Sequence, residues 1–293
     1  MTAKFNLPDF YTNPTTYTFL FELQQDNPEI FLDNTEIVSI FGCVPNCIWN
    51  GGSTFFGTTL LRKGLEEIVN LYNNIWHMPL RLTFTNCLLK EEHCYDSYCN
   101  LVAEVFETGM NEILVASPIL EKYLRQHYPN YKYCRSIIAA ENIPYDTSYD
   151  LTVLKRCYNN NWEFLNSIPK EERHKIEILC TDPCPVDCPR IYEHYKEFAT
   201  AQIAFDPSLK SPCSQGEKRT KFQHYEAART NPTFVTRELI DQKYLPMGFD
   251  QFKISGRMSI GQAIGQAVEY LIKPEYHVDV TCMLIDANIG LIT

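Results

Sequence analysis

The residues best suited to chemistry lie in one short loop, which begins at Cys180 and reads Cys-Thr-Asp-Pro-Cys-Pro-Val-Asp-Cys-Pro. Its three thiols, Cys180, Cys184 and Cys188, are spaced four residues apart, with prolines between them that restrict the backbone. Isolated cysteines usually fill apolar cores, whereas this loop is rich in proline and aspartate. The loop therefore predicts a site where several thiolates converge, with Cys213 as the fourth ligand.

The spacing of these cysteines leaves the kind of site open. Zinc takes four Cys or His ligands, often from pairs two residues apart, and no second pair follows here. Four thiolates from two loops suit a 4Fe-4S cluster at least as well. A cluster, a zinc ion and no metal at all remain the alternatives from spacing alone. His194, six residues after Cys188, is a weaker ligand candidate.

A cysteine nucleophile is the competing chemistry, because a hydrolase needs one activated thiolate beside a histidine. The candidate pairs are Cys188 with His194 and Cys94 with His93, and neither lies in a supporting motif. Three closely spaced cysteines favour metal ligands over a single nucleophile.

Short apolar runs alternate with amphipathic stretches along the chain, which predicts parallel strands joined by helices. Eight such units of about thirty residues are typical of a (β/α)8 TIM barrel. We expect one α/β domain: an N-terminal extension of residues 1–35, a barrel of residues 36–273 and a C-terminal tail of residues 274–293. The predicted strands are residues 36–41, 80–85, 112–116, 132–137, 151–155, 176–179, 201–205 and 249–254.

A barrel would carry its active site at the C-terminal ends of its strands, where the cysteine loop follows strand 176–179. Cys157, Cys43 and Cys47 follow other strands and are substitute ligands. Strand alternation turns the charged side chains of Arg81, Glu177 and Lys253 toward the barrel interior. Because buried charges need partners, we expect an ion network there, which could be structural or could bind substrate.

Further residues on the predicted rim are weaker substrate-site candidates. Trp49 and Asn50 follow the strand at 36–41, and Asn86 and His93 follow the strand at 80–85. Tight turns and ordinary packing explain these residues equally well.

The composition limits the classes of partner. The net charge of −10 argues against extended nucleic-acid binding or a hold on an anionic membrane, because both need clustered Lys and Arg. The chain does not start with charged residues followed by an apolar run, so we expect no signal peptide. It has no apolar segment long enough to predict a membrane span. We expect a cytoplasmic protein.

The segment Phe-Lys-Ile-Ser-Gly-Arg that ends at Arg257 resembles the Lys-Ile-Glu-Gly-Arg signature of the collagenase-like peptidase (U32) family. The strand Lys175-Ile-Glu-Ile-Leu179 before the cysteine loop and the run Asn111-Glu-Ile-Leu-Val115 are also similar to that family. The resemblance follows the element order over roughly residues 36–273. Ser255 stands where the signature has Glu, so a role of that carboxylate is missing here.

The resemblance implies a barrel with a four-cysteine iron–sulfur cluster on Cys180, Cys184, Cys188 and Cys213. It implies oxygen-independent hydroxylation of a small or RNA-borne substrate, with a separate oxygen donor; some members are described as peptidases. Lys253 and Arg257 match the basic positions of the signature, and with Glu177 and Arg81 they are the predicted catalytic residues. The alternatives are a peptidase of the same fold and a non-catalytic scaffold that partners a related subunit.

Overall fold

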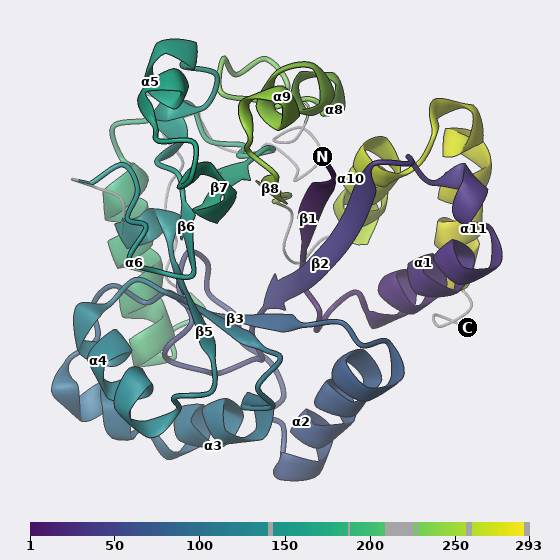
Figure 1. Cartoon of the computed structure of the whole chain (residues 1–293). Coiled ribbons are helices and arrows are strands. Elements are labelled where there is room, and N and C mark those ends of the chain that lie inside the picture. The colour runs from purple at the N-terminus through teal and green to yellow at the C-terminus, as the bar shows by residue number, and fades with distance from the viewer. Residues whose placement is uncertain (140–142, 187, 209–225, 227, 256–259, 290–293) are drawn as a thin grey trace.

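The computed structural model describes the chain except for residues 140–142, 187, 209–225, 227, 256–259 and 290–293. Its eight parallel strands close into a barrel in sequence order, each paired with the next and β8 paired with β1 (Figure 1). This confirms the predicted (β/α)8 architecture. The strands are β1 Ala3–Pro8, β2 Thr35–Gly42, β3 Leu80–Phe84, β4 Glu112–Val115, β5 Lys132–Arg135, β6 Leu151–Val153, β7 Ile176–Leu179 and β8 Gln251–Lys253.

The first strand lies where an N-terminal extension was predicted. β1 pairs with β2 on one side and β8 on the other, so the barrel cannot close without it. Ala3, Phe5 and Leu7 are buried in the outer core, while Asn6 points to the barrel interior and bonds to Arg81. The expected boundary at residue 36 is therefore wrong, and the barrel begins at Ala3.

The strand predicted at residues 201–205 is wrong as well. Residues 201–204 form the last turn of helix α6 (Ile191–Ala204), which ends at Phe205 in the left-handed conformation. Alternation of Ala201, Ile203 and Phe205 resembles a strand, but Ala199, Ala201 and Gln202 form the buried face of a helix.

The helices surround the barrel (Figure 1). The predicted C-terminal tail contains helix α11, which packs beside α1, and Asn288 Nδ2 donates to Thr16 Oγ1 at 3.0 Å. The α-helices are α1 Pro14–Asp26, α2 Arg62–Val69, α3 Ser97–Phe106, α4 Pro118–His127, α5 Trp162–Ser167, α6, α8 Arg237–Leu239, α9 Leu245–Met247, α10 Ile260–Leu271 and α11 His277–Ile289. Shorter helical turns are η1 Pro28–Ile30, η2 Asn70–Ile75, η3 Glu91–Tyr95, η4 Ile137–Ala139, η5 Arg156–Tyr158, η6 Arg173–Lys175, η7 Ile240–Tyr244 and η8 Pro274–Tyr276.

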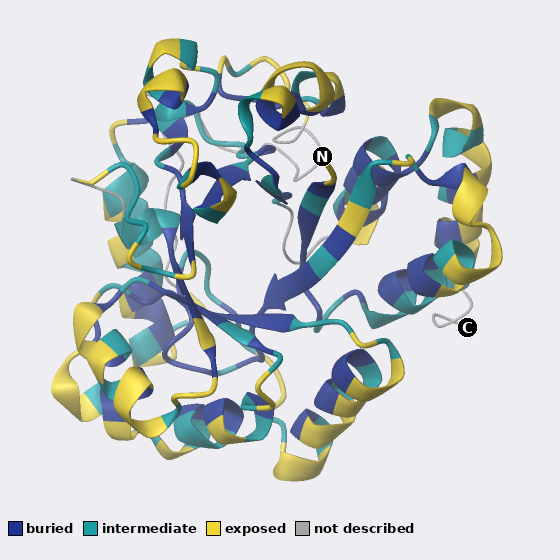
Figure 2. Cartoon of the chain, in the orientation of Figure 1, coloured by how far each residue is buried: buried dark blue, intermediate teal, exposed yellow. Residues whose placement is uncertain are grey.

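Alternation along the strands separates two environments. In β3 the side chains of Leu80, Leu82 and Phe84 join the apolar layer between barrel and helices, and Arg81 and Thr83 occupy the interior. Buried residues line the strands and the inner faces of the helices, and exposed residues cover the outside (Figure 2). In the described part of the chain, no helix is long and apolar enough to span a bilayer.

Candidate active site at the mouth of the barrel

A buried ion network fills the interior of the barrel. Arg81 Nε donates to Glu112 Oε2 and Arg81 Nη1 donates to Glu177 Oε1, both at 2.6 Å. Arg81 Nη2 donates to Asn6 Oδ1 at 3.0 Å. Burial alone would lower the pKa of Arg81, but the charges of Glu112 and Glu177 raise that pKa well above its usual value. The guanidinium therefore stays protonated, and the expected pairing of Arg81 with Glu177 is confirmed.

Glu177 is fully buried at the centre of this network. Its Oε1 accepts from Arg81, whereas its Oε2 has no hydrogen-bond partner among the described residues. An unpaired carboxylate oxygen in the interior is costly, because desolvation is not offset by a donor. Such an atom is a natural place for a ligand or a water to donate a hydrogen bond.

Lys253 ends β8 and points into the barrel, as the alternation predicted. Its Nζ lies 3.9 Å from the centroid of the Phe41 ring, and both residues line a cavity at the C-terminal ends of the strands. A cation over an aromatic face is held by attraction to the ring electrons. This position places a positive charge in the wall of the cavity.

The cavity, which we call the mouth cavity, has a volume of about 360 Å³. This size suits a small molecule. Hydroxyl groups and apolar side chains share its wall with Asp182 and Cys184 from a loop and with Lys253 from β8. The lining residues are Phe41, Gly52, Ser53, Thr83, Thr85, Leu114, Ser136, Ile137, Ile138, Leu179, Asp182, Pro183, Cys184, Tyr195, Lys253 and Ser255.

Ser255, the residue that replaces the signature's glutamate, joins two loops at the rim. Its N–H donates to Thr181 Oγ1 at 2.8 Å, and its hydroxyl donates to the Thr181 carbonyl. Thr181 Oγ1 in turn donates to Gln266 Oε1 at 3.1 Å. Ser255 therefore fastens the end of β8 to the segment after β7. Arg257 lies outside the described residues.

Cys180 does not face the mouth cavity. Alternation along β7 turns Leu179 inward and Cys180 toward the helices, where the thiol is fully buried in the apolar layer. Its Sγ lies 3.5 Å from the Ile178 carbonyl, and burial raises the pKa of the thiol well above its usual value. The prediction that Cys180 converges with the other loop cysteines is wrong.

Cys184 does reach the mouth cavity, in a loop that an ion pair anchors. Arg156 Nη1 lies 2.9 Å from Asp182 Oδ2, and both side chains are nearly buried. The Cys184 N–H donates to Asp182 Oδ1 at 3.0 Å. Burial, followed by the charge of Asp182, raises the pKa of the Cys184 thiol to about 12, so this thiol stays protonated at neutral pH.

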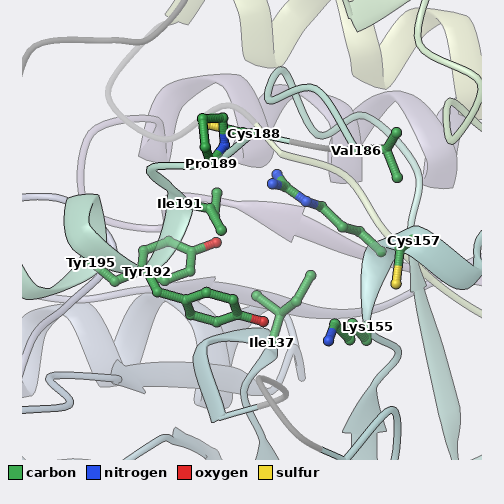
Figure 3. Close-up of a pocket in the computed structure, with 10 residues that line it drawn as sticks. Ile137, Lys155, Cys157, Val186, Cys188, Pro189, Ile191, Tyr192 and Tyr195 are labelled. Atoms are coloured by element: carbon green, nitrogen blue, oxygen red, sulfur yellow. The ribbon is translucent and has the colours of Figure 1, made fainter.

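Cys188 and Cys157 line a second, neighbouring cavity of about 230 Å³. Figure 3 shows Cys188 and Pro189 at one end of it and Lys155 and Ile137 at the other. Ile137 and Tyr195 line both cavities, so these side chains form part of the wall between them. The second cavity is also lined by Arg156, Val186, Ile191 and Tyr192.

The described cysteines do not by themselves supply four converging thiolates. Cys180 faces the apolar layer, and Cys184 and Cys188 line different cavities. Among the residues that the structure describes, no three Cys, His, Asp or Glu side chains are grouped so as to hold a metal ion. Cys213 lies outside those residues, so the predicted iron–sulfur or zinc site stays a prediction.

The weaker substrate candidates lie behind the cavity wall. Trp49 Nε1 donates to the His93 carbonyl at 2.8 Å, and His93 Nδ1 accepts from the Lys90 N–H. Asn86 Nδ2 donates to the Ile48 and Ala199 carbonyls. These residues hold loops together and do not line the mouth cavity.

Asn50 supports the wall more directly, since its Oδ1 accepts from the Thr83 hydroxyl at 3.1 Å. Cys43 and Cys47, the other substitute ligands, are buried in the outer core. The structure therefore pairs Arg81 with Glu177 inside the barrel, and it places Lys253 and Cys184 in the wall of the mouth cavity.

Sequence reasoning missed several residues of the site. Glu112 is the second carboxylate on Arg81, and its inward position in β4 follows from the same alternation that identified Arg81. Asp182 and Arg156 come from loops after different strands, and no local pattern links them. Tyr195 lies on α6, and only the three-dimensional fold brings it to the cavities.

Comparison with known proteins supports the fold. No protein-family model matches the chain, and no curated protein matches it significantly. Among solved structures, the U32 peptidase Mk0906 is similar, with a TM-score of 0.50 and 14% sequence identity over 88% of this chain and 93% of that one. The expected resemblance is thereby confirmed in structure. The chain has the barrel fold of the U32 peptidase Mk0906.

Proposed function

We propose that this chain is a barrel enzyme that binds a small, carboxylate-bearing substrate or oxygen donor in the mouth cavity. The observation that carries the proposal is the placement of Lys253 in the wall of a small cavity at the C-terminal strand ends. Active sites of (β/α)8 enzymes lie at this end of the barrel.

The charges around the cavity favour an anionic group. Asp182 and Lys253 are the charged residues of the lining, and Asp182 is engaged by Arg156 at 2.9 Å. Lys253 places a positive charge in the same wall, beside the Phe41 ring, and a charge-assisted hydrogen bond from its ammonium group to a carboxylate is one of the stronger polar contacts. The hydroxyls of Thr85 and Ser136 can donate to the remaining oxygens.

The apolar part of the lining suits the body of such a ligand. Leu114, Ile138 and Leu179 supply aliphatic surface beside the hydroxyl groups. The cavity is too small for a folded partner or a duplex, which agrees with the acidic composition. A single exposed residue or base could still enter it, so a substrate presented by RNA remains within the proposal.

A hydroxylase-type redox reaction is the finer form of this proposal. The described residues provide no ligand set for the cluster on which such a step would depend. Metal and sulfide analysis of protein prepared without oxygen tests it directly. Iron and sulfide that disappear in Cys184→Ser and Cys188→Ser, but persist in Cys180→Ser, would support a cluster built with residues outside the described part.

A cysteine peptidase is less consistent with the site. Cys184 reaches the mouth cavity, but its pKa of about 12 keeps it as a thiol at neutral pH. No histidine lines either cavity in the described part of the chain. A thiol without a base is a poor nucleophile.

The scaffold alternative, with a related subunit as partner, predicts co-purification of that subunit and no turnover by the isolated chain.

The test is a calorimetric titration of the protein with a series of small mono- and dicarboxylates. A charge-assisted bond is worth about 1.5–3 kcal/mol, so Lys253→Met should weaken binding roughly 10- to 150-fold. Lys63→Met, which removes an exposed lysine paired with Glu67, is the matched control and should bind as the parent does. The carboxamide analogue of the best acid should lose a similar factor with the unmodified protein.

Equal affinities of the parent protein and Lys253→Met, in variants that fold, would remove the proposal. So would equal affinities for the acid and its carboxamide.

A further inference from the structure

A pair of buried thiols lies between the loop after β2 and helix α3. Cys47 Sγ lies 3.3 Å from Cys99 Sγ, although the residues are 52 positions apart. Both side chains are fully buried. The two sulfurs are therefore close enough to bond after a shift of roughly 1.3 Å, since a disulfide spans about 2.05 Å.

The surroundings distinguish the two thiols. Burial raises the pKa of Cys47, but hydrogen bonds with Cys43, with Cys99 and with the backbone N–H of Trp49 outweigh it and lower that pKa to about 5. Burial and the hydrogen bond to Cys47 raise the pKa of Cys99 well above its usual value.

We propose that Cys47 and Cys99 form a redox-active dithiol that a hydroperoxide converts into a disulfide. The Cys47 sulfur attacks one peroxide oxygen and gives up its proton, the O–O bond breaks, and the leaving oxygen takes up a proton and departs as an alcohol or water. Cys47 is then a sulfenic acid. The Cys99 sulfur forms the S–S bond, and the oxygen on Cys47 leaves as water with the Cys99 proton. One peroxide is reduced for each disulfide formed.

A peroxide must reach sulfurs that are buried, and the loop provides a route. Residues 43–61 contain no helix or strand. Their described anchors include the bonds between Asn46 and Gly57 and the bond of Phe55 N–H to Gln202 Oε1. Opening must also break the bonds of Asn86 and Gln202 to carbonyls of this loop, so we expect peroxide to enter during local opening of the segment. A small hydroperoxide can then enter, whereas a protein oxidant would need a larger opening.

The disulfide would affect the candidate active site through the same loop. Gly52 and Ser53 line the mouth cavity, and Cys47 O accepts from Gln202 Nε2 at 3.2 Å. An S–S bond would fasten this wall of the cavity to α3. The thiol chemistry itself does not depend on the proposed function.

The experiment treats the folded, reduced protein with hydrogen peroxide, blocks remaining thiols by alkylation and maps the digest by mass spectrometry without reduction. We expect one linked peptide pair, Cys47 with Cys99, that has lost two hydrogen atoms and is restored by dithiothreitol. Cys94→Ser, which removes a nearby buried thiol outside the pair, should give the same link. Cys99→Ser should leave a sulfenic acid on Cys47 that dimedone captures.

Two results would overturn the proposal, and neither depends on a variant. One is full alkylation of Cys47 and Cys99 after a treatment that oxidises the exposed Cys282. The other is a link from either residue to a different cysteine in the folded protein. Oxidation of the chain unfolded in guanidinium provides the reference for random pairing.

Discussion

Replacement of Arg81 by methionine tests the buried network beneath the mouth cavity. Arg81 is almost completely buried and holds both Glu112 and Glu177 at 2.6 Å. The change removes the cation and leaves Glu177, which is fully buried, with no donor on either carboxylate oxygen. Breaking a buried ion pair by removing one partner costs about 3–5 kcal/mol. That is a large share of a typical stability of about 5–15 kcal/mol.

The assay is urea unfolding at neutral pH, followed by circular dichroism. Arg62→Met is the matched control, because Arg62 pairs with Glu104 at 2.9 Å while both side chains are at least half exposed. Exposed pairs contribute about 0–1 kcal/mol. The double variant Arg81→Met with Glu177→Gln should recover part of the loss, since it also removes the stranded charge.

The reasoning would be refuted if Arg81→Met lost no more stability than Arg62→Met. Strictly additive losses in the double variant would also show that Arg81 and Glu177 do not interact as described.

Two further predictions concern the loops around the cavity. Gly51→Ala would place a Cβ 2.4 Å from the carbonyl carbon and oxygen of Thr85, so we expect a loss of about 1–3 kcal/mol in unfolding measurements. Gly261→Ala meets no atom within 4 Å and is the control; equal losses would contradict the argument. The raised pKa of Cys184, about 12, predicts slow alkylation by iodoacetamide at pH 8 compared with exposed Cys282. Equal alkylation rates for the two cysteines would contradict the raised pKa of Cys184. Because the pKa of this thiol is higher in the folded than in the unfolded protein, the stability that the buried thiol contributes is present below about pH 8.5 and is lost as the pH rises toward 12.

The alternation of side chains made much of the barrel predictable. Arg81 stands between Leu80 and Leu82 in a strand-like run. Because the two leucines face the apolar layer, the Arg81 side chain must point into the barrel, where its charge can find a partner. The same rule placed Glu177 and Lys253. Strand β1 was not predicted because it lies close to the N-terminus and ends at Pro8, and because polar Lys4 and Asn6 interrupt its apolar residues.

The cysteine loop shows why spacing alone did not place Cys180 correctly. Even spacing suggested three sulfurs aimed at one point, but Cys180 still belongs to the backbone ladder. Its N–H donates to the Lys253 carbonyl at 2.8 Å and its carbonyl accepts from Val235. That continuation of the β7 alternation directs the thiol to the apolar layer. Contacts between separate loops, such as Arg156 with Asp182, depend on the closed barrel and have no local signal.

The contact between Cys47 and Cys99 is of the same kind. Cys47 in a loop and Cys99 in a helix are 52 positions apart, and no local pattern around Cys99 indicates more than a buried apolar residue.

The most direct test of the proposed site is a crystal structure of the protein with the tightest-binding small carboxylate. The proposal predicts the acid inside the mouth cavity, with a carboxylate oxygen within hydrogen-bond distance of Lys253 Nζ and of the hydroxyl of Thr85 or Ser136. A saturating acid bound elsewhere, with this cavity holding only water, would contradict it.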